Sequence, residues 1–230
     1  MEMSPAEWTA ILLSLRVAAV ATVVATPLGI ALAWLLARRD FWGKSALDAL
    51  IHLPLVLPPV VTGYLLLLSF GRHGLAGGFL ADHLGIVFAF RWTGAALACG
   101  VMAFPLLVRP IRLSIEAVDQ RLEQASATLG AAPWQVFATV TLPLALPGIL
   151  AGMVLGFAKA IGEFGATITF VSNIPGETQT ISSAIYSLIQ TPDGDTAALR
   201  LVVISIIIAT SALIGSEWFA RRATQRLHGN

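Results

Sequence analysis

Five apolar stretches, each about as long as a lipid bilayer is thick, constrain this chain more than any other feature. They run approximately over residues 10–36, 46–70, 92–108, 144–171 and 197–220. A helix needs about 20 apolar residues to cross the hydrocarbon core of a membrane. The chain is 57% hydrophobic and 12% charged, and that charged share is about half of what soluble domains carry. The sequence therefore predicts a single all-α, polytopic membrane domain over residues 1–230.

Two segments bear on the number of spans. The opening residues, MEMSPAEW, lack basic residues, and the apolar run after them is longer than the core of a signal peptide, about 7–15 residues. We therefore expect the first stretch to be retained as a span. Residues 84–90 are apolar but too short to cross, so they lie at the interface or extend the third span. About five spans result.

The basic residues predict which way the chain crosses, because cytoplasmic loops are enriched in Lys and Arg. Two alternate loops and the C-terminal tail carry nine of them: Arg38, Arg39, Lys44, Arg109, Arg112, Arg121, Arg221, Arg222 and Arg226. The opposite loops and nearby span ends carry three, which are Arg72, Arg91 and Arg200. The sequence thus predicts an N-terminus outside and a C-terminus in the cytoplasm, as an odd number of spans requires.

The predicted cytoplasmic loop over residues 109–142 is amphipathic. Residues 122–129 are rich in good helix formers, and Gly130 stands where a left-handed cap would end such a helix. Pro133 favours the first turn of a second short helix. Leu142 and Pro143 are then expected to end it and to begin the fourth span. We predict two short helices at a sharp angle, rigidly joined to a membrane helix.

The same loop resembles a family motif. Permeases of ABC importers carry the pattern Glu-Ala-Ala, three residues, Gly, nine residues, Ile, one residue, Leu-Pro. The spacing is matched here at every anchor by Gln124, Ala125, Ser126, Gly130, Val140, Leu142 and Pro143. Two anchors depart from the pattern: Gln124 replaces the Glu, with Glu123 one position earlier, and Ser126 replaces the second Ala. The resemblance implies a coupling loop that docks into a separate ATP-binding subunit.

Two further stretches resemble the permeases of molybdate importers. These are residues 52–63 (HLPLVLPPVVTG) and residues 162–178 (GEFGATITFVSNIPGET). The resemblance implies the transmembrane domain of a type I ABC importer in the bacterial cytoplasmic (inner) membrane. It implies two copies of an ATP-binding subunit, an external (periplasmic or extracellular) molybdate-binding protein and surrounding lipid as partners. Because five spans barely enclose a path, we also expect a second copy of this chain.

A few polar residues within the spans are candidates for the translocation path. Lys159 and Glu163 lie four residues apart, and therefore on one helix face. They either contact an anion or neutralise each other within the packing. Arg16 either lines the path or extends to the interface. The hydroxyls of Thr62 and Thr167 face an anion or bond to their own helix backbone.

Several other functions find little support. No GxxxxGK[ST] loop, no HExxH and no histidine pair with metal spacing is present. We therefore expect no catalytic residues, no metal and no cofactor, with ATP used only by the partner subunit. A net charge of +1 gives no reason to expect nucleic acid. The alternatives are a sulfate or tungstate importer permease, an ion-coupled secondary transporter using Lys159 and Glu163, or an intramembrane enzyme.

Overall fold

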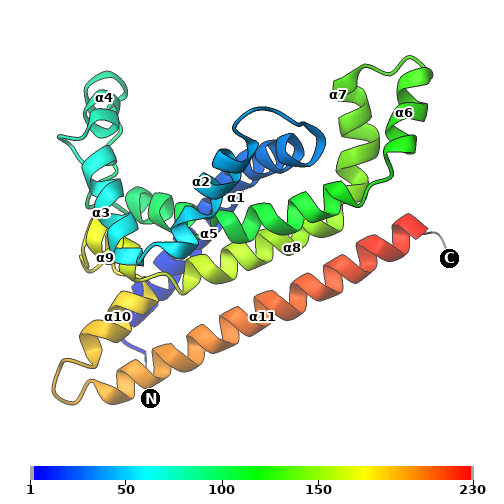
Figure 1. Cartoon of the computed structure of the whole chain (residues 1–230). Helices are drawn as coiled ribbons and strands as arrows, with labels where there is room; N and C mark the ends of the chain where they lie inside the picture. The colour runs from blue at the N-terminus through cyan, green and yellow to red at the C-terminus, as the bar shows by residue number, and fades with distance from the viewer. Residues whose placement is uncertain (1–2, 229–230) are drawn as a thin grey trace.

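The structure, a computed structural model, describes the backbone of residues 3–228 and the side chains of residues 3–215. Within that part of the chain every regular element is helical (Figure 1). The elements are α1 (Pro5–Arg38), α2 (Lys44–Val56), α3 (Pro59–Phe70), α4 (Leu75–Leu84), α5 (Trp92–Glu116), α6 (Gln120–Thr128), α7 (Pro133–Val136), the π-helical turn η1 (Phe137–Thr141), α8 (Leu142–Ile161), α9 (Gly165–Val171), α10 (Ile181–Leu188) and α11 (Asp195–His228). The side chains of the tail arginines Arg221, Arg222 and Arg226 lie outside the described residues.

The described helices include four that are long and apolar enough to cross a membrane, or five if the bent pair α2 and α3 counts as one span. This confirms the polytopic all-α fold. Helix α5 is central: 61% of its most apolar 18-residue stretch is buried inside the protein, against 11% for the matching stretch of α11. Figure 1 shows α11 as a long rod along one side of the bundle. It therefore presents most of its apolar surface outward, as a lipid-facing helix does.

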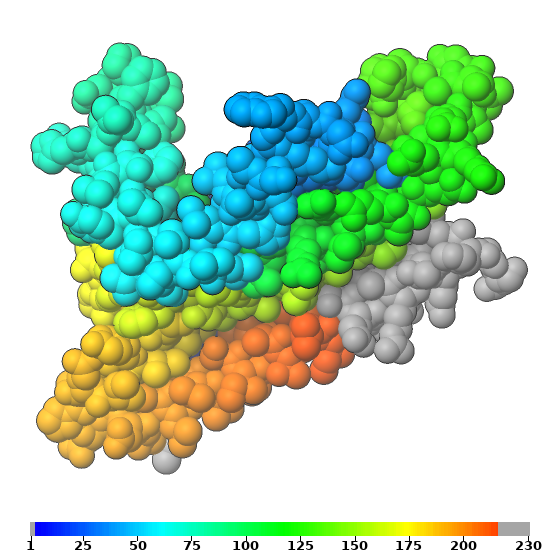
Figure 2. Space-filling view, in the orientation of Figure 1, coloured from blue at the N-terminus to red at the C-terminus, as the bar shows by residue number. Residues whose placement is uncertain are grey.

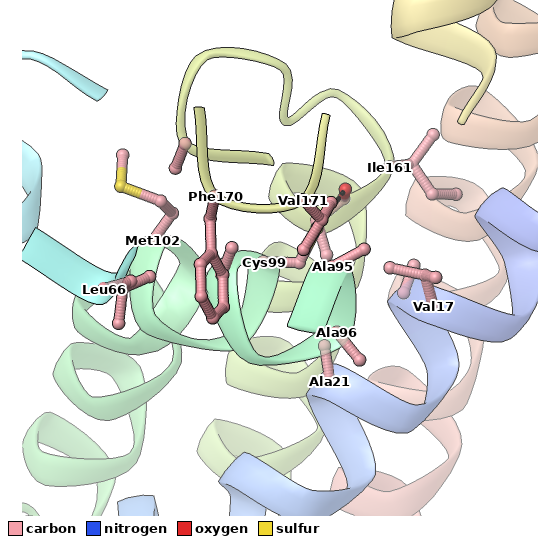
Figure 3. Close-up of a cluster of buried hydrophobic side chains, with 14 of the residues drawn as sticks. Val17, Ala21, Leu66, Ala95, Ala96, Cys99, Met102, Ile161, Phe170 and Val171 are labelled. Carbon is pink, nitrogen blue, oxygen red and sulfur yellow. Dashed lines mark hydrogen bonds between the residues drawn. The ribbon is translucent and has the colours of Figure 1, made fainter. Parts of the chain in front are cut away.

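The core lies where α1, α5, α8 and α9 meet. Figure 3 shows Val17 of α1, Cys99 of α5 and Phe170 of α9 converging there. Helix α5 contributes a run of small side chains to this core, and small side chains let neighbouring backbones approach closely. The buried thiol of Cys99 lies 3.4 Å from the carbonyl oxygen of Ala160 in α8. The arrangement places α8 and α9 firmly against α5.

The second apolar stretch differs from its prediction as one span over residues 46–70. Helices α2 and α3 meet at an angle of 115°. The reason is local: a residue before proline is disfavoured in the helical conformation, and Leu57 precedes Pro58, which itself precedes Pro59. Leu57 and Pro58 accordingly have extended ψ values of 144° and 132°. Two consecutive extended residues break the helix instead of only kinking it.

The fourth stretch also departs from prediction, at both ends. Leu142 and Pro143 do not end a helix, because α7, η1 and α8 run on without a break from Pro133 to Ile161. The wider π-turn accommodates a proline that lacks a donor, and the N–H of Leu142 bonds five residues back to Phe137. The predicted span over residues 144–171 is instead interrupted at residues 162–164, between α8 and α9.

The two ends of the molecule carry projections on the same side (Figure 2). One consists of α3 and α4, and the other of α6 and α7. Helix α5 continues to Glu116, so the first eight residues of the predicted loop 109–142 belong to a long helix. The segment 84–90 neither spans nor extends α5: it follows α4 and is non-helical from Gly85 on. The N-terminus lies near the start of α11, at the end opposite α6.

Candidate translocation path and coupling loop

The loop between α5 and α8 is a rigid two-helix projection. The side chain of Asp119 caps α6 by accepting from the N–H of Arg121 at 2.9 Å. Gly130 has a φ of +91°, the left-handed conformation predicted for it, and its N–H bonds to the carbonyl of Ala127. The N–H of Ala132 donates to the Gln135 side chain at 2.7 Å and so caps α7. Local hydrogen bonds thus hold both helices and the turn between them.

The tip of this projection, at the Gly130 turn, displays two large apolar side chains. Leu129 is 89% exposed and Trp134 is 70% exposed, on either side of the Gly130 turn. Helix α6 buries no residue, and Gln124 and Ala125 are among its exposed residues. Large apolar side chains displayed together on a capped, rigid element are typical of a surface that a partner covers.

The motif residues are divided between this surface and the base of the projection. Ser126 is half-buried within α6, and Val140, Leu142 and Pro143 are half-buried around η1 and the start of α8. Glu123 turns away from the exposed face. The motif residues therefore lie partly on the exposed face of α6 and partly at the base of the projection around η1 and the start of α8, so they do not form one continuous surface.

Glu123 is held by residues that sequence spacing does not connect to it. Its Oε1 atom accepts from Arg38 at 3.1 Å and 3.3 Å and from the Thr141 hydroxyl at 2.5 Å. Arg38 also donates to the carbonyl of Val118 at 3.0 Å. Arg38 lies at the end of α1, which is 85 residues away from Glu123 in the sequence, so no periodicity signals the contact.

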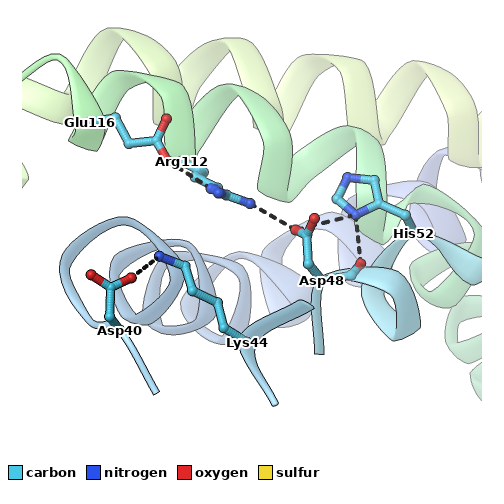
Figure 4. Close-up of polar contacts among 6 residues, drawn as sticks. All are labelled: Asp40, Lys44, Asp48, His52, Arg112 and Glu116. Carbon is cyan, nitrogen blue, oxygen red and sulfur yellow. Dashed lines mark hydrogen bonds and ion pairs between the residues drawn. The ribbon is translucent and has the colours of Figure 1, made fainter. Parts of the chain in front are cut away.

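A second polar cluster lies nearby, where α2 approaches α5 (Figure 4). The guanidinium of Arg112 contacts Asp48 at 2.8 Å and Glu116 at 2.8 Å. His52 Nδ1 lies 2.9 Å from the carbonyl oxygen of Asp48. At the start of α2, Lys44 donates at 2.8 Å to Asp40 in the preceding loop, and this hydrogen bond lowers the pKa of the Asp40 carboxyl. One ion pair, between Arg112 and Asp48, thus ties α2 to the end of α5 that leads into α6.

Lys159 and Glu163 form the ion pair that their spacing indicates. The ammonium of Lys159 lies 2.7 Å from Oε2 of Glu163, while Oε1 accepts from the N–H of Ala166 at 2.9 Å. The Glu163 side chain is 1% exposed and that of Lys159 is 29% exposed. One buried carboxylate therefore joins the last turn of α8 to the first turn of α9 across the break between them.

Thr62 and Thr167 lie near this break but differ in their partners. The Thr167 hydroxyl donates to the carbonyl of Phe164 at 2.8 Å, which is the backbone alternative considered from the sequence. Thr62 is 5% exposed and its hydroxyl has no hydrogen-bond partner among the described residues. Both residues are enclosed, because α3 packs directly on α9.

Arg16 stands apart from the other candidates. It is exposed on α1, and its guanidinium carbon lies 3.7 Å from the centre of the Trp92 ring at the start of α5. Such a cation–π contact suits a charged group at the edge of a membrane. The structure therefore brings Lys159 and Glu163 together, with Thr167 on the adjoining α9, and leaves Arg16 outside that group.

One apolar cavity among the helices does not suit an anion. It has a volume of about 570 Å³ and lies between α1, α2 and α5. Leu28, Ile51 and Phe104 are typical of its lining, to which Thr93 adds the sole side-chain hydroxyl. A dianion there would lose its hydration and find few donors to replace it. Nor do the described residues bring three His, Cys, Asp or Glu side chains together as a metal site.

Comparison with known proteins gives consistent matches over nearly the whole chain. Residues 25–225 match the family model described as "Binding-protein-dependent transport system inner membrane component". The chain is 61% identical over 220 residues to the molybdenum transport system permease protein ModB of Escherichia coli K12, covering 96% of each chain. It is 57% identical over 221 residues to ModB of Haemophilus influenzae, again with 96% coverage of each.

The fold matches a solved structure as well. One chain of a bacterial alginate ABC transporter, crystallised in complex with an alginate pentasaccharide-bound periplasmic protein, superposes with a TM-score of 0.75. The match covers 96% of this chain and 81% of that one, at 18% sequence identity. At that identity the likeness shows a shared architecture of the transmembrane helices.

Proposed function

The chain belongs to the family of binding-protein-dependent transport system inner membrane components, and from this membership we propose that it is the permease subunit of a molybdate ABC importer. It is a multi-pass protein of the bacterial inner membrane with the fold of a type I importer transmembrane domain. The observation that carries the substrate is the 61% identity to a molybdenum transport permease over 96% of both chains. The permease itself is not an enzyme.

The proposed assembly supplies what one chain lacks. Two copies of an ATP-binding subunit hydrolyse ATP, and a second copy of this chain completes the path within the lipid. A periplasmic or extracellular molybdate-binding protein delivers the anion at the end of the molecule that holds α4 and α10. The named periplasmic protein in the alginate transporter structure supports such a partner for this fold.

The coupling loop is proposed to dock into the ATP-binding subunit through the apolar side chains at its tip, which are Leu129 and Trp134. Leu129 and Trp134 are exposed beside the fixed turn at Gly130, and this shape suits insertion into a groove of the ATP-binding subunit. Gln124 presents a neutral amide there, since the acidic side chain of Glu123 is engaged elsewhere. When nucleotide closes the ATP-binding dimer, the projection moves with it, and the membrane helices reorient to alternate access.

The proposed path passes the break between α8 and α9. Lys159 supplies a partly accessible positive charge there, and the unpartnered hydroxyl of Thr62 supplies a donor once α3 and α9 move apart. Glu163 neutralises Lys159 at rest, which prevents the anion from being held too tightly. Thr167 lies in the first turn of α9, and Arg16 attracts the anion from the outer edge.

The test is uptake by the reconstituted complex. The permease, its candidate ATP-binding subunit and its binding protein are placed in liposomes, and ATP hydrolysis and anion uptake are measured with molybdate, tungstate or sulfate. We expect molybdate to stimulate both activities. Stimulation by sulfate alone would retain the architecture and reject the substrate. Uptake by the permease without the ATP-binding subunit, driven by an ion gradient, would instead support the secondary transporter.

A further inference from the structure

A single carboxylate oxygen connects three parts of the protein that are distant in sequence. Oε1 of Glu123, in the first turn of α6, accepts from Arg38 at the end of α1 and from Thr141 at the end of η1. The side chains of Arg38 and Glu123 are 9% and 18% exposed. At this degree of burial the ion pair is poorly screened by water and salt, in contrast to surface pairs.

Arg38 also closes the entry to the loop. Its Nη2 atom donates both to Glu123 and to the carbonyl of Val118, in the segment that connects α5 to α6. One guanidinium therefore holds the start of the loop and the body of α6 together. In the same cleft, the rings of Trp34 in α1 and Phe137 in η1 meet edge to face, with their centres 6.0 Å apart. Two of the three elements, α1 and η1, therefore also share a packed contact, whereas α6 joins them through the polar contact.

Helix α6 has little else to fix it to the membrane domain. None of its residues is buried. The other side-chain hydrogen bonds recorded within α6, at Arg121 and Thr128, are to residues two or three positions away. A cleft of about 350 Å³ separates it from α1 and α7, and Arg38, Glu123 and Thr141 all line this cleft. The hydrogen bonds of Glu123 to Arg38 and Thr141 are therefore the polar side-chain contacts through which a movement of α6 reaches α1 and η1.

We propose that Arg38, Glu123 and Thr141 form a mechanical tether, through which movement of α6 is passed to α1 and to the root of α8. This rests on the proposed function, because it is the ATP-binding subunit that moves α6. Glu123 is a positioning residue: neighbouring residues on a helix point about 100° apart, so with Glu123 turned inward Gln124 faces outward. The tether couples hydrolysis to helix movement rather than adding contact to the partner.

The test compares variants that loosen the tether with matched neighbours. Glu123→Gln removes the charge, and Thr141→Val removes one donor at nearly constant shape. The controls are Thr139→Val, whose hydroxyl bonds only to the Gln135 carbonyl in its own helix, and Lys44→Gln, whose ammonium pairs with Asp40 outside this cleft. In the reconstituted complex we measure molybdate transported per ATP hydrolysed. We expect the ratio to fall about tenfold in both tether variants and to stay unchanged in both controls.

Rescue by a conservative variant separates positioning from folding. Glu123→Asp keeps the charge, and we expect it to recover part of the transport ratio that Glu123→Gln loses. A general folding defect would lower ATP hydrolysis and transport together, leaving their ratio unchanged, and this result would overturn the proposal. So would a normal ratio in Glu123→Gln.

Hydrogen exchange provides a readout that does not depend on the substrate. In the assembled complex, we expect amides of residues 119–129 to exchange faster in Glu123→Gln than in the wild type, while amides of α5 keep their protection. If the wild type fails to transport molybdate, the proposed function fails, and this exchange result still decides on the tether. Unchanged exchange in residues 119–129 would reject the tether whatever the substrate is.

Discussion

The carboxylate of Glu163 lies 2.7 Å from the ammonium of Lys159 and 2.9 Å from the backbone nitrogen of Ala166. It thereby bridges α8 and α9 across a three-residue interruption, where the backbone bonds of α8 end with Gly162 to Ala158 and Glu163 to Ala160. The Glu163 side chain is 1% exposed, so its charge depends on Lys159 for compensation. Its two bonds connect the end of α8 to the start of α9, and the ion pair can be removed while the bond to Ala166 is kept.

Lys159→Met is expected to destabilise the protein by about 3 kcal/mol, because it leaves a buried carboxylate without its counter-charge. Glu163→Gln is expected to cost less, since its amide oxygen still accepts from Ala166 and the partly exposed Lys159 reaches water. Thermal unfolding of the detergent-solubilised complex measures both. Equal losses in the two variants would contradict this account of the bridge.

The double variant Lys159→Met with Glu163→Gln separates a bridge from an anion contact. Removing both charges together is expected to restore most of the stability lost in Lys159→Met. If Lys159 also contacts the anion, as proposed for the path, the double variant stays stable while molybdate uptake remains low. Recovery of uptake together with stability would remove Lys159 from the path.

The contact between α3 and α9 depends on Gly63. A Cβ atom at this position would lie 2.5 Å from the carbonyl oxygen of Ala166 and 2.9 Å from Cβ of Thr169. Gly63→Ala is therefore expected to push the helices apart, at a cost of about 2 kcal/mol, and to lower uptake. Thermal unfolding and uptake measure the effect. Gly100→Ala is the control, since its nearest neighbour would lie 3.7 Å away; a similar loss there would disprove the steric explanation.

The features that could be predicted best from the sequence are turns and side-chain pairs formed by residues close together in the chain. Gly130 and Pro133 shape the coupling loop through their own backbone preferences, and Lys159 and Glu163 meet because they are four residues apart. The bend at Pro58 was missed although its cause is local. A single proline can either kink or end a helix: Pro27 and Pro105 lie inside continuous helices, whereas Pro58 and Pro59 in succession coincide with a break.

The contacts of Arg38 show what the sequence could not predict, namely pairs of residues that lie far apart in the chain. Its partner Glu123 is 85 residues away and its partner Val118 is 80 residues away. Nothing in the periodicity of α1 indicates them, and charge counting assigned Arg38 only to the cytoplasmic side. The same holds for Arg200 of α11, which contacts Glu7 of α1 at 2.9 Å. Such pairs follow from how the helices are assembled, which a single sequence does not state.

The orientation of the chain predicts opposite labelling at its two ends. Leu75 in α4 is 97% exposed and Leu129 beside the coupling turn is 89% exposed. With the N-terminus outside, Leu75→Cys is expected to react with a membrane-impermeant thiol reagent in intact spheroplasts, and Leu129→Cys only after lysis. The native Cys99 is buried and contributes little background. Labelling of Leu129→Cys before lysis would reverse the assigned topology.

The turn at Gly130 offers a graded test of how rigid the coupling loop must be. No atom lies within 4 Å of a Cβ placed there, so the cost of a side chain comes from the φ of +91° alone. Gly130→Ala is expected to strain the turn by about 1 kcal/mol and to reduce molybdate-stimulated ATP hydrolysis partially. Gly130→Pro cannot adopt this φ and is expected to abolish the stimulation while basal hydrolysis by the ATP-binding subunit persists.

Gly215→Ala is the matched control for this series, because a Cβ there also meets no atom within 4 Å while the residue lies inside α11 at an ordinary helical φ. It should leave stimulation unchanged. If Gly130→Pro couples normally, the turn does not transmit force, and α6 must then act through its tether to Arg38 without a fixed angle to α7. If all three variants lose stimulation, added volume rather than backbone conformation is responsible, and the rigid-turn mechanism is wrong.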